Sequence, residues 1–286
     1  MQMKNAEYAK ISIRNLLEEK FGNIQFIEEG HEYFIEDEKY TPVSTIISEY
    51  EQPFDEDRVA DNYAKKNRRT KEDVLKEWKF KNLKSTIGGS RVHEFGESYT
   101  NMVAGFPENI CEANRKQYVD CRGEMMLIPT FPKESAVKKF YDEKSEYLTP
   151  IGAEFKLSTR YMGDKVRKIC GTCDLLFYEE DPLFGEDQFV LADWKTNVSL
   201  TNDYKRKNNI CMKFPFDNMI DDALSHYTLQ FNLYRRMLES VGVKIGDMRL
   251  IWLKEDGDYE IVKIGKLNDS ILDRVLTKWF GYTAIE

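Results

Sequence analysis

The stretch Phe189-Val-Leu-Ala-Asp193-Trp-Lys195 decides the fold, and Gly171-Thr-Cys-Asp174-Leu-Leu-Phe177 is its counterpart earlier in the chain. Each is an apolar run with an acid set into it, which is typical of a buried strand that ends at a polar site. Because side chains alternate along a strand, Asp193 and Lys195 share one face, and Trp194 packs on the other. We therefore expect two neighbouring strands whose ends bring Asp174 and Asp193 to one ion.

The elements predicted around these strands form a central mixed β-sheet flanked by helices, an α/β (α+β) fold. Strands are expected over residues 153–160, 168–178, 189–195, 248–253 and 259–264, and an amphipathic helix over residues 225–241. The last two strands flank Asp256-Gly257, which is typical of a hairpin turn. A polar connection over residues 197–222 and a final helix over about residues 268–280 complete this part of the chain.

The first half of the chain is predicted to be mainly helical. Helices are expected over residues 5–21, from Thr41 onward, over most of the basic stretch 56–86, from Ser90 to about Gly105, and over residues 113–127 and 134–144. A hairpin is expected over residues 23–27 and 31–35. Pro42 lies near the first turn of the helix that begins at Thr41, with Thr or Ser as its cap. Gly88-Gly89 is expected to interrupt the helical pattern before Ser90.

One domain is expected over residues 1–286, because no Pro/Gly/Ser-rich linker divides the chain. It comprises a mainly helical N-terminal elaboration (residues 1–150), the core sheet with its flanking helix (151–265) and a C-terminal helix (266–286). No stretch approaches the roughly 18 apolar residues of a membrane span, and the N-terminus has no apolar signal region. Five cysteines, odd in number and unevenly spaced, make no disulfide framework, so a cytoplasmic protein with reduced thiols is expected.

The acids and the lysine at the strand ends predict a metal-dependent hydrolytic site. Mg²⁺ takes oxygen ligands and keeps waters and phosphate oxygens in its shell, which suits two converging carboxylates. Lys195 is placed to orient the attacking water or to neutralise developing charge. An Asp-X-Lys pair by itself is usually a solvated strand face. Two acids in buried-type strands, however, are costly unless something compensates them, and a metal is the simplest compensation.

Two further residues are candidates for the same site. Glu154, on the preceding predicted strand, is a candidate ligand, directly or through water. His93 follows Gly88-Gly89, which leaves room for close approach, and Glu97 lies one turn on. A lone helical histidine is more often structural, whereas an imidazole ligand would shift the preference of the site toward Mn²⁺.

Four short segments, taken in order, resemble the PD-(D/E)XK nuclease superfamily. They are Gly89-x-x-x-His93, Gly171-Thr172-Cys173-Asp174, Asp193-Trp194-Lys195-Thr196 and Gln230-x-x-x-Tyr234. More narrowly, the set is similar to the RecB-like branch, which includes phage exonucleases and the mitochondrial genome maintenance exonuclease. The segments His31-Glu-Tyr33 and Tyr40–Ile47 are similar to the opening of these enzymes. Many members have Glu where this chain has Asp193.

The resemblance implies a restriction-endonuclease-like core and a role for each matched residue. His93, Asp174 and Asp193 would be metal ligands for one or two Mg²⁺ or Mn²⁺ ions, and Lys195 the catalytic lysine. Gln230 and Tyr234 would contact DNA or brace that lysine, although Tyr234 also suits plain packing. Some relatives carry an iron–sulfur cluster, which is not expected here because no cysteine follows Cys211. Cys170 and Cys173 are expected to be small buried residues.

Charge distribution indicates where a nucleic acid would bind. The formal net charge is −8, but residues 62–91 hold ten Lys/Arg against three acids. Such runs are usually solvated helix faces, yet interleaved aromatics just before His93 suit a strand guided by charge and stacking. The expected DNA contacts are Gln230, Tyr234, Lys65, Lys66, Arg68, Arg69, Arg91, Lys205, Arg206 and Lys207.

Together these features predict a metal-dependent DNA exonuclease acting on single strands or duplex ends. Phage or bacterial recombination, repair or DNA processing is the expected setting, with phage or host recombination or replication proteins as partners and no membrane. Three alternatives stay open: a structure-selective endonuclease or RNase of the same fold, a non-catalytic nucleic-acid-binding protein on that fold, and an unrelated α/β protein whose motifs match by chance.

Overall fold

The computed structural model describes residues 5–27, 30, 32–106, 117–119, 125–127, 131–162, 166–180 and 187–278. The expected residues 113–116 and 120–124 of one helix, 279–280 of the last helix and His31 of the opening motif lie outside this part. None of the helices in the described ranges is long and apolar enough to cross a membrane.

Helices and strands alternate irregularly along the chain. The helices are α1 (Asn5–Phe21), α2 (Val43–Ser48), α3 (Glu56–Asn67), α4 (Lys71–Val103), α5 (Phe131–Lys144), α6 (Asp203–Lys207), α7 (Ala223–Ser240) and α8 (Asp269–Lys278). The strands are β1 (Gln25–Ile27), β2 (Glu32–Ile35), β3 (Glu38–Pro42), β4 (Gln117–Val119), β5 (Met125–Leu127), β6 (Leu148–Met162), β7 (Val166–Glu179), β8 (Gln188–Lys195), β9 (Ile245–Leu253) and β10 (Tyr259–Lys263).

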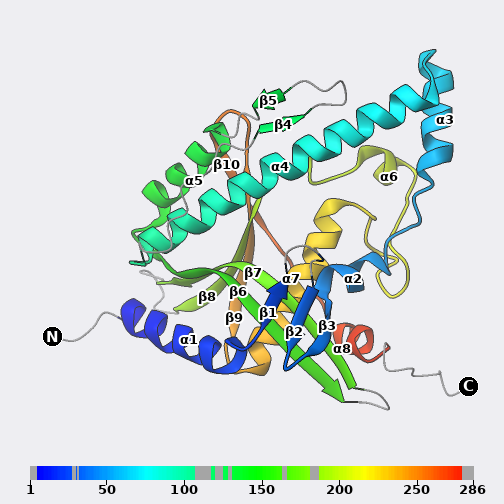
Figure 1. The fold of residues 1–286 in the computed structure, drawn as a ribbon. Helices are drawn as coiled ribbons and strands as arrows, with labels where there is room; N and C mark the ends of the chain where they lie inside the picture. The colour runs from blue at the N-terminus through cyan, green and yellow to red at the C-terminus, as the bar shows by residue number, and fades with distance from the viewer. Residues whose placement is uncertain are drawn as a thin grey trace, which may run out of the picture.

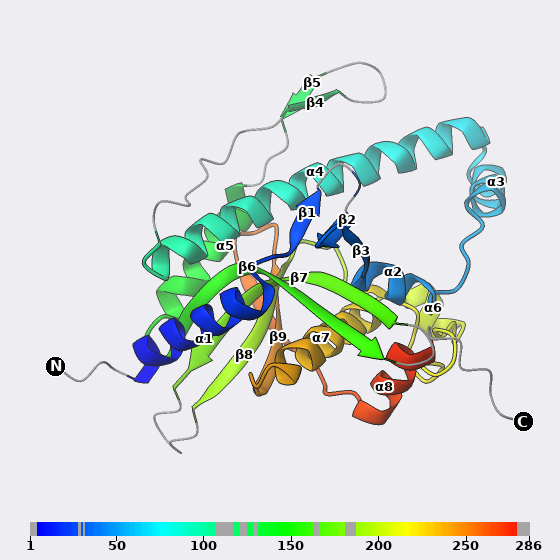
Figure 2. The same ribbon diagram turned by 60° about the horizontal axis from the view of Figure 1, so that its bottom comes forward.

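An eight-stranded mixed sheet forms the centre of the molecule, in the order β1-β2-β3-β7-β8-β9-β10, with β6 paired to β7. One hydrophobic cluster joins the sheet to α1, α2, α7 and α8, and a second joins it to α4 and α5. Figures 1 and 2 show α4 crossing over the sheet as a long rod, with α7 beneath. The predicted mixed sheet flanked by helices is confirmed, including the N-terminal helix.

Strand β7 pairs with β6 along one edge, and its other edge is divided between two neighbours, which creates the candidate site. Its first half pairs in parallel with β3, through Thr41–Ile169 and Pro42–Cys170. Its second half pairs antiparallel with β8, ending at Leu175–Ala192. Beyond that pair β8 continues beside β9 alone. The sheet therefore forks between β3 and β8, at the level of residues 171–174.

Helix α4 is continuous over 33 residues, so the predicted break at Gly88-Gly89 is wrong. Glycine costs about 1 kcal/mol in a helix interior, but tertiary packing outweighs that cost here. Val92 is buried against the sheet, and a Cβ on Gly96 would lie 2.7 Å from Trp194 Nε1. The glycines let the helix lie close on the end of β8.

Two other local predictions are corrected. Residues 117–119 and 125–127 pair as strands β4 and β5, where a helix over 113–127 was expected. Helix α2 begins at Val43, with Pro42 as an N-cap that makes no side-chain hydrogen bond, because Thr41 already belongs to strand β3. In both places strand pairing overrides the local helical signal. The hairpin β1–β2 was predicted and is confirmed.

Candidate metal centre

Asp174 and Asp193 lie directly beyond the last residue pair that joins β7 and β8. Since that pair is Leu175–Ala192, each acid is the next residue outward on its strand. Alternation turns Trp194 into the core between the sheet and α4, where it is 1% exposed. Asp193 and Lys195 share the opposite face. The local pattern predicted this arrangement correctly.

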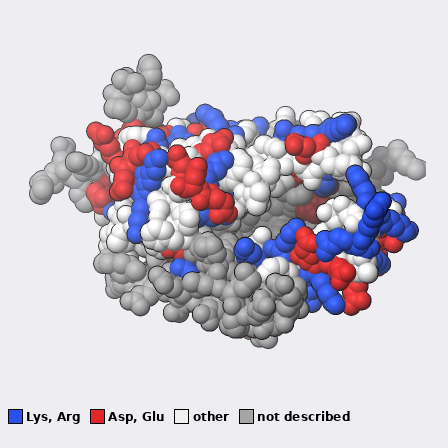
Figure 3. All heavy atoms as spheres, turned by 90° about the horizontal axis from the view of Figure 1, so that it is seen from above, with Lys and Arg blue, Asp and Glu red and all other residues white. Residues whose placement is uncertain are grey.

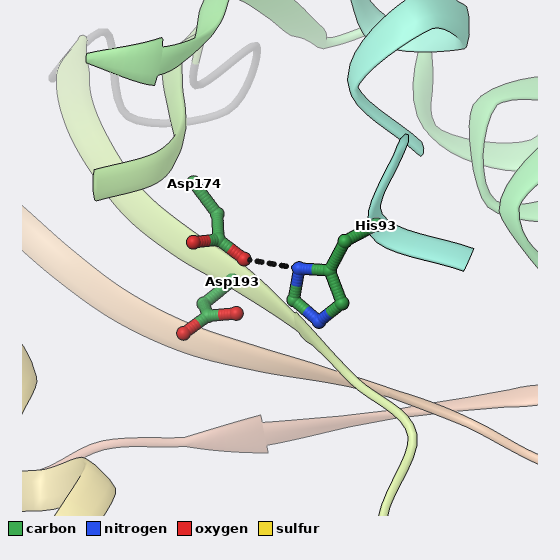
Figure 4. A group of neighbouring side chains, drawn as sticks. All are labelled: His93, Asp174 and Asp193. Atoms are coloured by element: carbon green, nitrogen blue, oxygen red, sulfur yellow. Dashed lines mark ion pairs between the residues drawn. The ribbon is translucent and has the colours of Figure 1, made fainter. Parts of the chain in front are cut away.

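Helix α4 supplies the third member of the group, His93. Its Nδ1 lies 2.9 Å from Asp174 Oδ2. One ligand atom from each of His93, Asp174 and Asp193 falls within 4.8 Å of the other two. Figure 4 shows the three side chains pointing toward one another from three different elements. The continuity of α4 across Gly88-Gly89 is what carries the imidazole over the fork.

The two carboxyl groups have opposite electrostatic environments. Burial raises the pKa of Asp174, but His93, a hydrogen bond with Asp193 and the charge of Lys195 together outweigh burial, so the pKa lies well below its usual range. Burial and the charge of Asp174 raise the pKa of Asp193 well above its usual range. Among the described residues, Asp193 Oδ1 has no hydrogen-bond partner although it is buried. A buried carboxylate oxygen without a partner is costly.

Lys195 completes the cluster from the end of β8. Its Nζ lies 2.5 Å from Asp193 Oδ2 and 4.4 Å from the centre of the Tyr227 ring. Burial lowers the pKa of Lys195, but Asp193 and Asp174 outweigh burial and raise it above its ordinary value. The ammonium therefore stays charged. Tyr227 also donates to Asn197 Oδ1 at 2.8 Å, and sequence reasoning placed it only on the apolar face of a helix.

Glu154 approaches Asp174 from strand β6. Its neighbours Ala153 and Phe155 pair with Leu175 and Cys173, which puts Glu154 across from Asp174. Its φ is 56°, a left-handed conformation that is rare outside glycine. Burial, and then the charge of Asp174, raises the pKa of Glu154 to about 8. Strain and charge repulsion at one residue are typical of functional sites.

A divalent cation fits the donor set of this centre. Two carboxylates and one imidazole converge, and within the described ranges the buried Asp193 Oδ1 has no hydrogen-bond partner. Oxygen donors suit Mg²⁺ or Mn²⁺, and the imidazole adds preference for Mn²⁺. The positive charge of a bound cation would offset the repulsion between the Asp174 and Asp193 carboxylates. The residues expected as ligands are therefore brought together with the chemistry that a metal requires.

Gln230 and Tyr234 lie behind the centre. Gln230 donates to Tyr234 Oη at 3.2 Å. Tyr234 is 7% exposed and packs on the backbone of Gly171, where a Cβ would lie 2.6 Å from its ring. It supports the strand that carries Asp174, and the ring over Lys195 belongs to Tyr227. Cys170 and Cys173 are buried in the same region, as expected, and burial raises the pKa of both thiols.

The basic residues around α3 are largely paired with acids on the same surface. Lys65 bonds Asp61 at 2.5 Å, and Arg69 bonds Glu77 at 2.5 Å. Figure 3 shows Lys and Arg with Asp and Glu among them over α3 and the start of α4. Lys66 and Arg68 lie at the end of α3 and beyond it.

The other expected basic contacts lie in two different settings. Arg91 is 7% exposed and donates to Glu134 at 3.0 Å, so its guanidinium faces the interior. On α6, Lys205 pairs with Asp221 at 2.7 Å and Arg206 with Asp222 at 3.4 Å. These two residues hold the connection before α7 in place. Lys207 is exposed on the same short helix.

The known proteins that resemble the chain are distant from it. No family model and no curated protein matches the chain. The solved structure of SSO0001 is similar, with a TM-score of 0.30 and 11% identity, over 68% of this chain and 76% of that one. A "putative exonuclease" from Eubacterium rectale is similar with a TM-score of 0.38 and 13% identity, over 68% of this chain and 63% of that one. At such likeness, function has to be inferred from the side chains.

Proposed function

We propose that the protein is a metal-dependent nuclease that hydrolyses phosphodiester bonds of DNA. The observation that carries this proposal is the centre at the fork. His93, Asp174 and Asp193 offer three ligand atoms within 4.8 Å of one another, and Lys195 is ion-paired to Asp193. A purely structural cluster would satisfy its buried acids with protein donors, and Asp193 Oδ1 has none among the described residues.

Each residue has a distinct role in this proposal. His93, Asp174 and Asp193 would hold Mg²⁺ or Mn²⁺, with Glu154 as a further ligand, directly or through water. A bound divalent ion lowers the pKa of water and stabilises charge on a phosphoryl group. Lys195, kept charged by Asp193, would orient the water and neutralise the developing charge. Tyr227 would fix the position of the lysine through its ring.

The activity proposed is that of an exonuclease on single strands or duplex ends. The order of the motifs supports it, because this set resembles the RecB-like exonucleases of the PD-(D/E)XK superfamily. Phage or bacterial recombination, repair or DNA processing is the proposed setting. Gln230 and Tyr234 act here by supporting the strand under Asp174, consistent with their burial and mutual hydrogen bond.

Digestion of end-labelled DNA tests the proposal. Linear single strands, linear duplexes and closed circles are incubated with Mg²⁺, Mn²⁺ or EDTA, using wild-type, Asp193→Asn and Lys195→Ala proteins. The proposal predicts metal-dependent loss of linear DNA that both substitutions abolish. Cleaved circles would indicate an endonuclease, and cleavage of RNA alone an RNase. Nucleic-acid binding without any cleavage would contradict the enzyme and favour a non-catalytic binding protein.

A further inference from the structure

A cavity of about 740 Å³ opens beside the metal centre, between α4 and the end of β8. His93 and Lys195 form its inner end. Its other walls come from α4, the first turn of α5, the residues after β8 and the turn between β9 and β10. They include Lys81, Lys84, Gly89, Lys133, Thr196, Val198 and Glu255. Some of these segments are distant in sequence, so no local pattern predicts the cavity.

The charge of this cavity is mainly positive. Four lysines line it, and Glu255 is its one carboxylate among the described residues. Lys81 is paired with Glu77, outside the cavity. Lys84 is exposed and has no ion-pair partner in the described part of the chain. A cationic pocket directly beside a centre for phosphodiester hydrolysis suits an anionic chain.

Lys133 is the most constrained of these lysines. Its side chain is 14% exposed, and its Nζ donates to the backbone carbonyl of Thr196 at 2.9 Å. The same Nζ pairs at 2.7 Å with Glu255, whose side chain is 71% exposed. Because Thr196 directly follows Lys195, this contact ties the ammonium of Lys133 to the end of the catalytic strand. The exposed carboxylate of Glu255 can leave, whereas the buried lysine stays.

We propose that this cavity binds backbone phosphates of a single nucleic-acid strand beside the bond to be cut, with Lys84 and Lys133 as the phosphate contacts. The proposal rests on the proposed nuclease function and names the substrate class of the same site. Without a bound strand, the Glu255 carboxylate would occupy the position of a phosphate group beside Lys133. A bound strand would displace it. Lysine contacts to phosphate carry no sequence information, so binding is expected to be independent of sequence.

The size of the cavity favours a single strand over a duplex. Its volume lies within the roughly 300–1,000 Å³ of pockets for one small ligand, which suits a nucleotide or two. Beside the cavity α4 lies close to the residue after β8, since a Cβ on Gly89 would lie 3.3 Å from Thr196 Oγ1. Val198, 90% exposed at the rim, offers an apolar contact for a base. We therefore expect the cavity to accept one strand in preference to a duplex.

Binding by the full-length protein in EDTA tests the proposal without cleavage. The readout is fluorescence anisotropy of a labelled single-stranded oligonucleotide and of the matching duplex, at several salt concentrations. Lys84→Glu is compared with Lys79→Glu, an exposed lysine on the same helix that does not line the cavity. Glu255→Gln is compared with Glu260→Gln, an acid on the same hairpin that lies outside the cavity.

Opposite effects are expected from the two cavity substitutions. Lys84→Glu should weaken single-strand binding on the order of tenfold and reduce the salt slope by about 0.7. Glu255→Gln should tighten it, because Lys133 no longer has a competing carboxylate, and both controls should bind like wild type. Equal losses for Lys84→Glu and Lys79→Glu would overturn the proposal. Equally strong duplex binding with the same dependence on Lys84 would overturn the single-strand assignment.

The outcome is separable from that of the proposed nuclease function. Metal-dependent cleavage with no specific loss in Lys84→Glu would retain the enzyme and reject this cavity as its strand site. Absence of cleavage by wild type, together with a loss specific to Lys84→Glu, would retain the cavity as a strand-binding site and reject the enzyme.

Discussion

The molecule contains two buried aspartates that each lie beside a lysine and near a histidine, and they differ in how their oxygens are satisfied. Asp221, 1% exposed, accepts from Lys205 Nζ at 2.7 Å, pairs with His226 Nε2 at 2.7 Å and accepts from the Gln52 backbone at 3.2 Å. Burial raises the pKa of Asp221, but these donors outweigh burial and lower it.

Asp193, 4% exposed, presents the opposite case. Lys195 pairs with one of its oxygens, the other has no partner among the described residues, and its pKa is raised. The same three residue types therefore form two different sites. At Asp221 the carboxylate is satisfied by protein donors, a closed anchor, and at Asp193 one oxygen has no protein partner among the described residues, an open centre. The difference shows that residue composition does not mark a functional site. What marks it is a buried carboxyl oxygen without a partner among the described residues, beside a second acid whose charge opposes its ionisation.

The largest difference between the two aspartates is expected in cleavage activity. Asp193→Asn keeps the shape of the side chain but removes its charge, so metal-dependent cleavage should fall at least about a thousandfold. The rate is measured on an end-labelled single strand. Asp221→Asn is the matched control, and its activity per folded molecule should stay within a few-fold of wild type. Equal losses in both variants would mean that the two acids do not differ in function.

For stability we expect the opposite order, with the larger loss in Asp221→Asn. Asp221→Asn leaves two partly buried donors, Lys205 and His226, without a charged acceptor and should cost about 1–3 kcal/mol. For a chain of this size that corresponds to roughly 2–5 °C in the unfolding temperature. Asp193→Asn should change it less, because the loss of its ion pair with Lys195 is offset by the removed repulsion between the two carboxylates. Thermal unfolding in EDTA measures both, and a larger loss for Asp193→Asn would contradict the assignment.

The open centre should also determine the dependence of stability on pH. The pKa of Glu154 is raised to about 8 from an ordinary 4.5, so between these values the folded protein holds a proton that the unfolded chain has lost. Without metal, stability should therefore fall as pH rises through this window. Metal binding requires ionised carboxylates, so Mn²⁺ affinity should rise with pH.

Glu154→Gln isolates that contribution. Unfolding temperatures without metal, measured from about pH 5 to pH 8, should fall less steeply in this variant than in wild type. The comparison uses low pH as its reference, where both proteins are neutral at this position. An identical pH profile for the two proteins would show that Glu154 does not titrate as its surroundings require.

A change in the packing of α4 on β8 should lower both stability and the cleavage rate, with a smaller effect on activity than Asp193→Asn. In Gly96→Ala the new Cβ would lie 2.7 Å from Trp194 Nε1, so α4 must shift from β8. We expect a loss of about 1–3 kcal/mol in stability and a reduced cleavage rate, because His93 is one turn away. Gly105→Ala changes a glycine beyond the helix and serves as the control for activity. Full activity in Gly96→Ala would show that the position of His93 tolerates movement of the helix.

The smallest effect is expected on the paired basic surface. Reversing Lys65, Lys66, Arg68 and Arg69 to Glu should weaken DNA binding and flatten its salt dependence. Because Lys65 and Arg69 are already paired with acids, the loss per residue should be smaller than for Lys84→Glu. The anisotropy titration described above measures it. Unchanged binding would remove this surface from the path of the strand.

Local patterns predicted the parts of the site that lie within single elements. Strand alternation is sufficient to place Asp193 and Lys195 together and Trp194 apart. The fork of β7 could not be predicted, since it depends on pairing between Pro42 and Cys170, which lie far apart in the sequence. The register of β6 likewise determines where Glu154 lies.

Helix α4 shows the opposite limit. Gly88-Gly89 predicted a break because local propensity ignores what the helix packs on, and contact with β8 keeps it intact. No local sequence pattern indicates that Tyr227 or Lys133 belongs to the site. Each reaches the end of β8 from a different element, so their contribution depends on tertiary structure.

Calorimetric titration of Mn²⁺ at about pH 8 tests the central claim most directly, using wild-type, Asp193→Asn and Asp221→Asn proteins. The open centre predicts saturable binding to wild type and to Asp221→Asn, with binding lost in Asp193→Asn. Binding that persists unchanged in Asp193→Asn, or no binding to wild type, would contradict a metal centre formed by His93, Asp174 and Asp193.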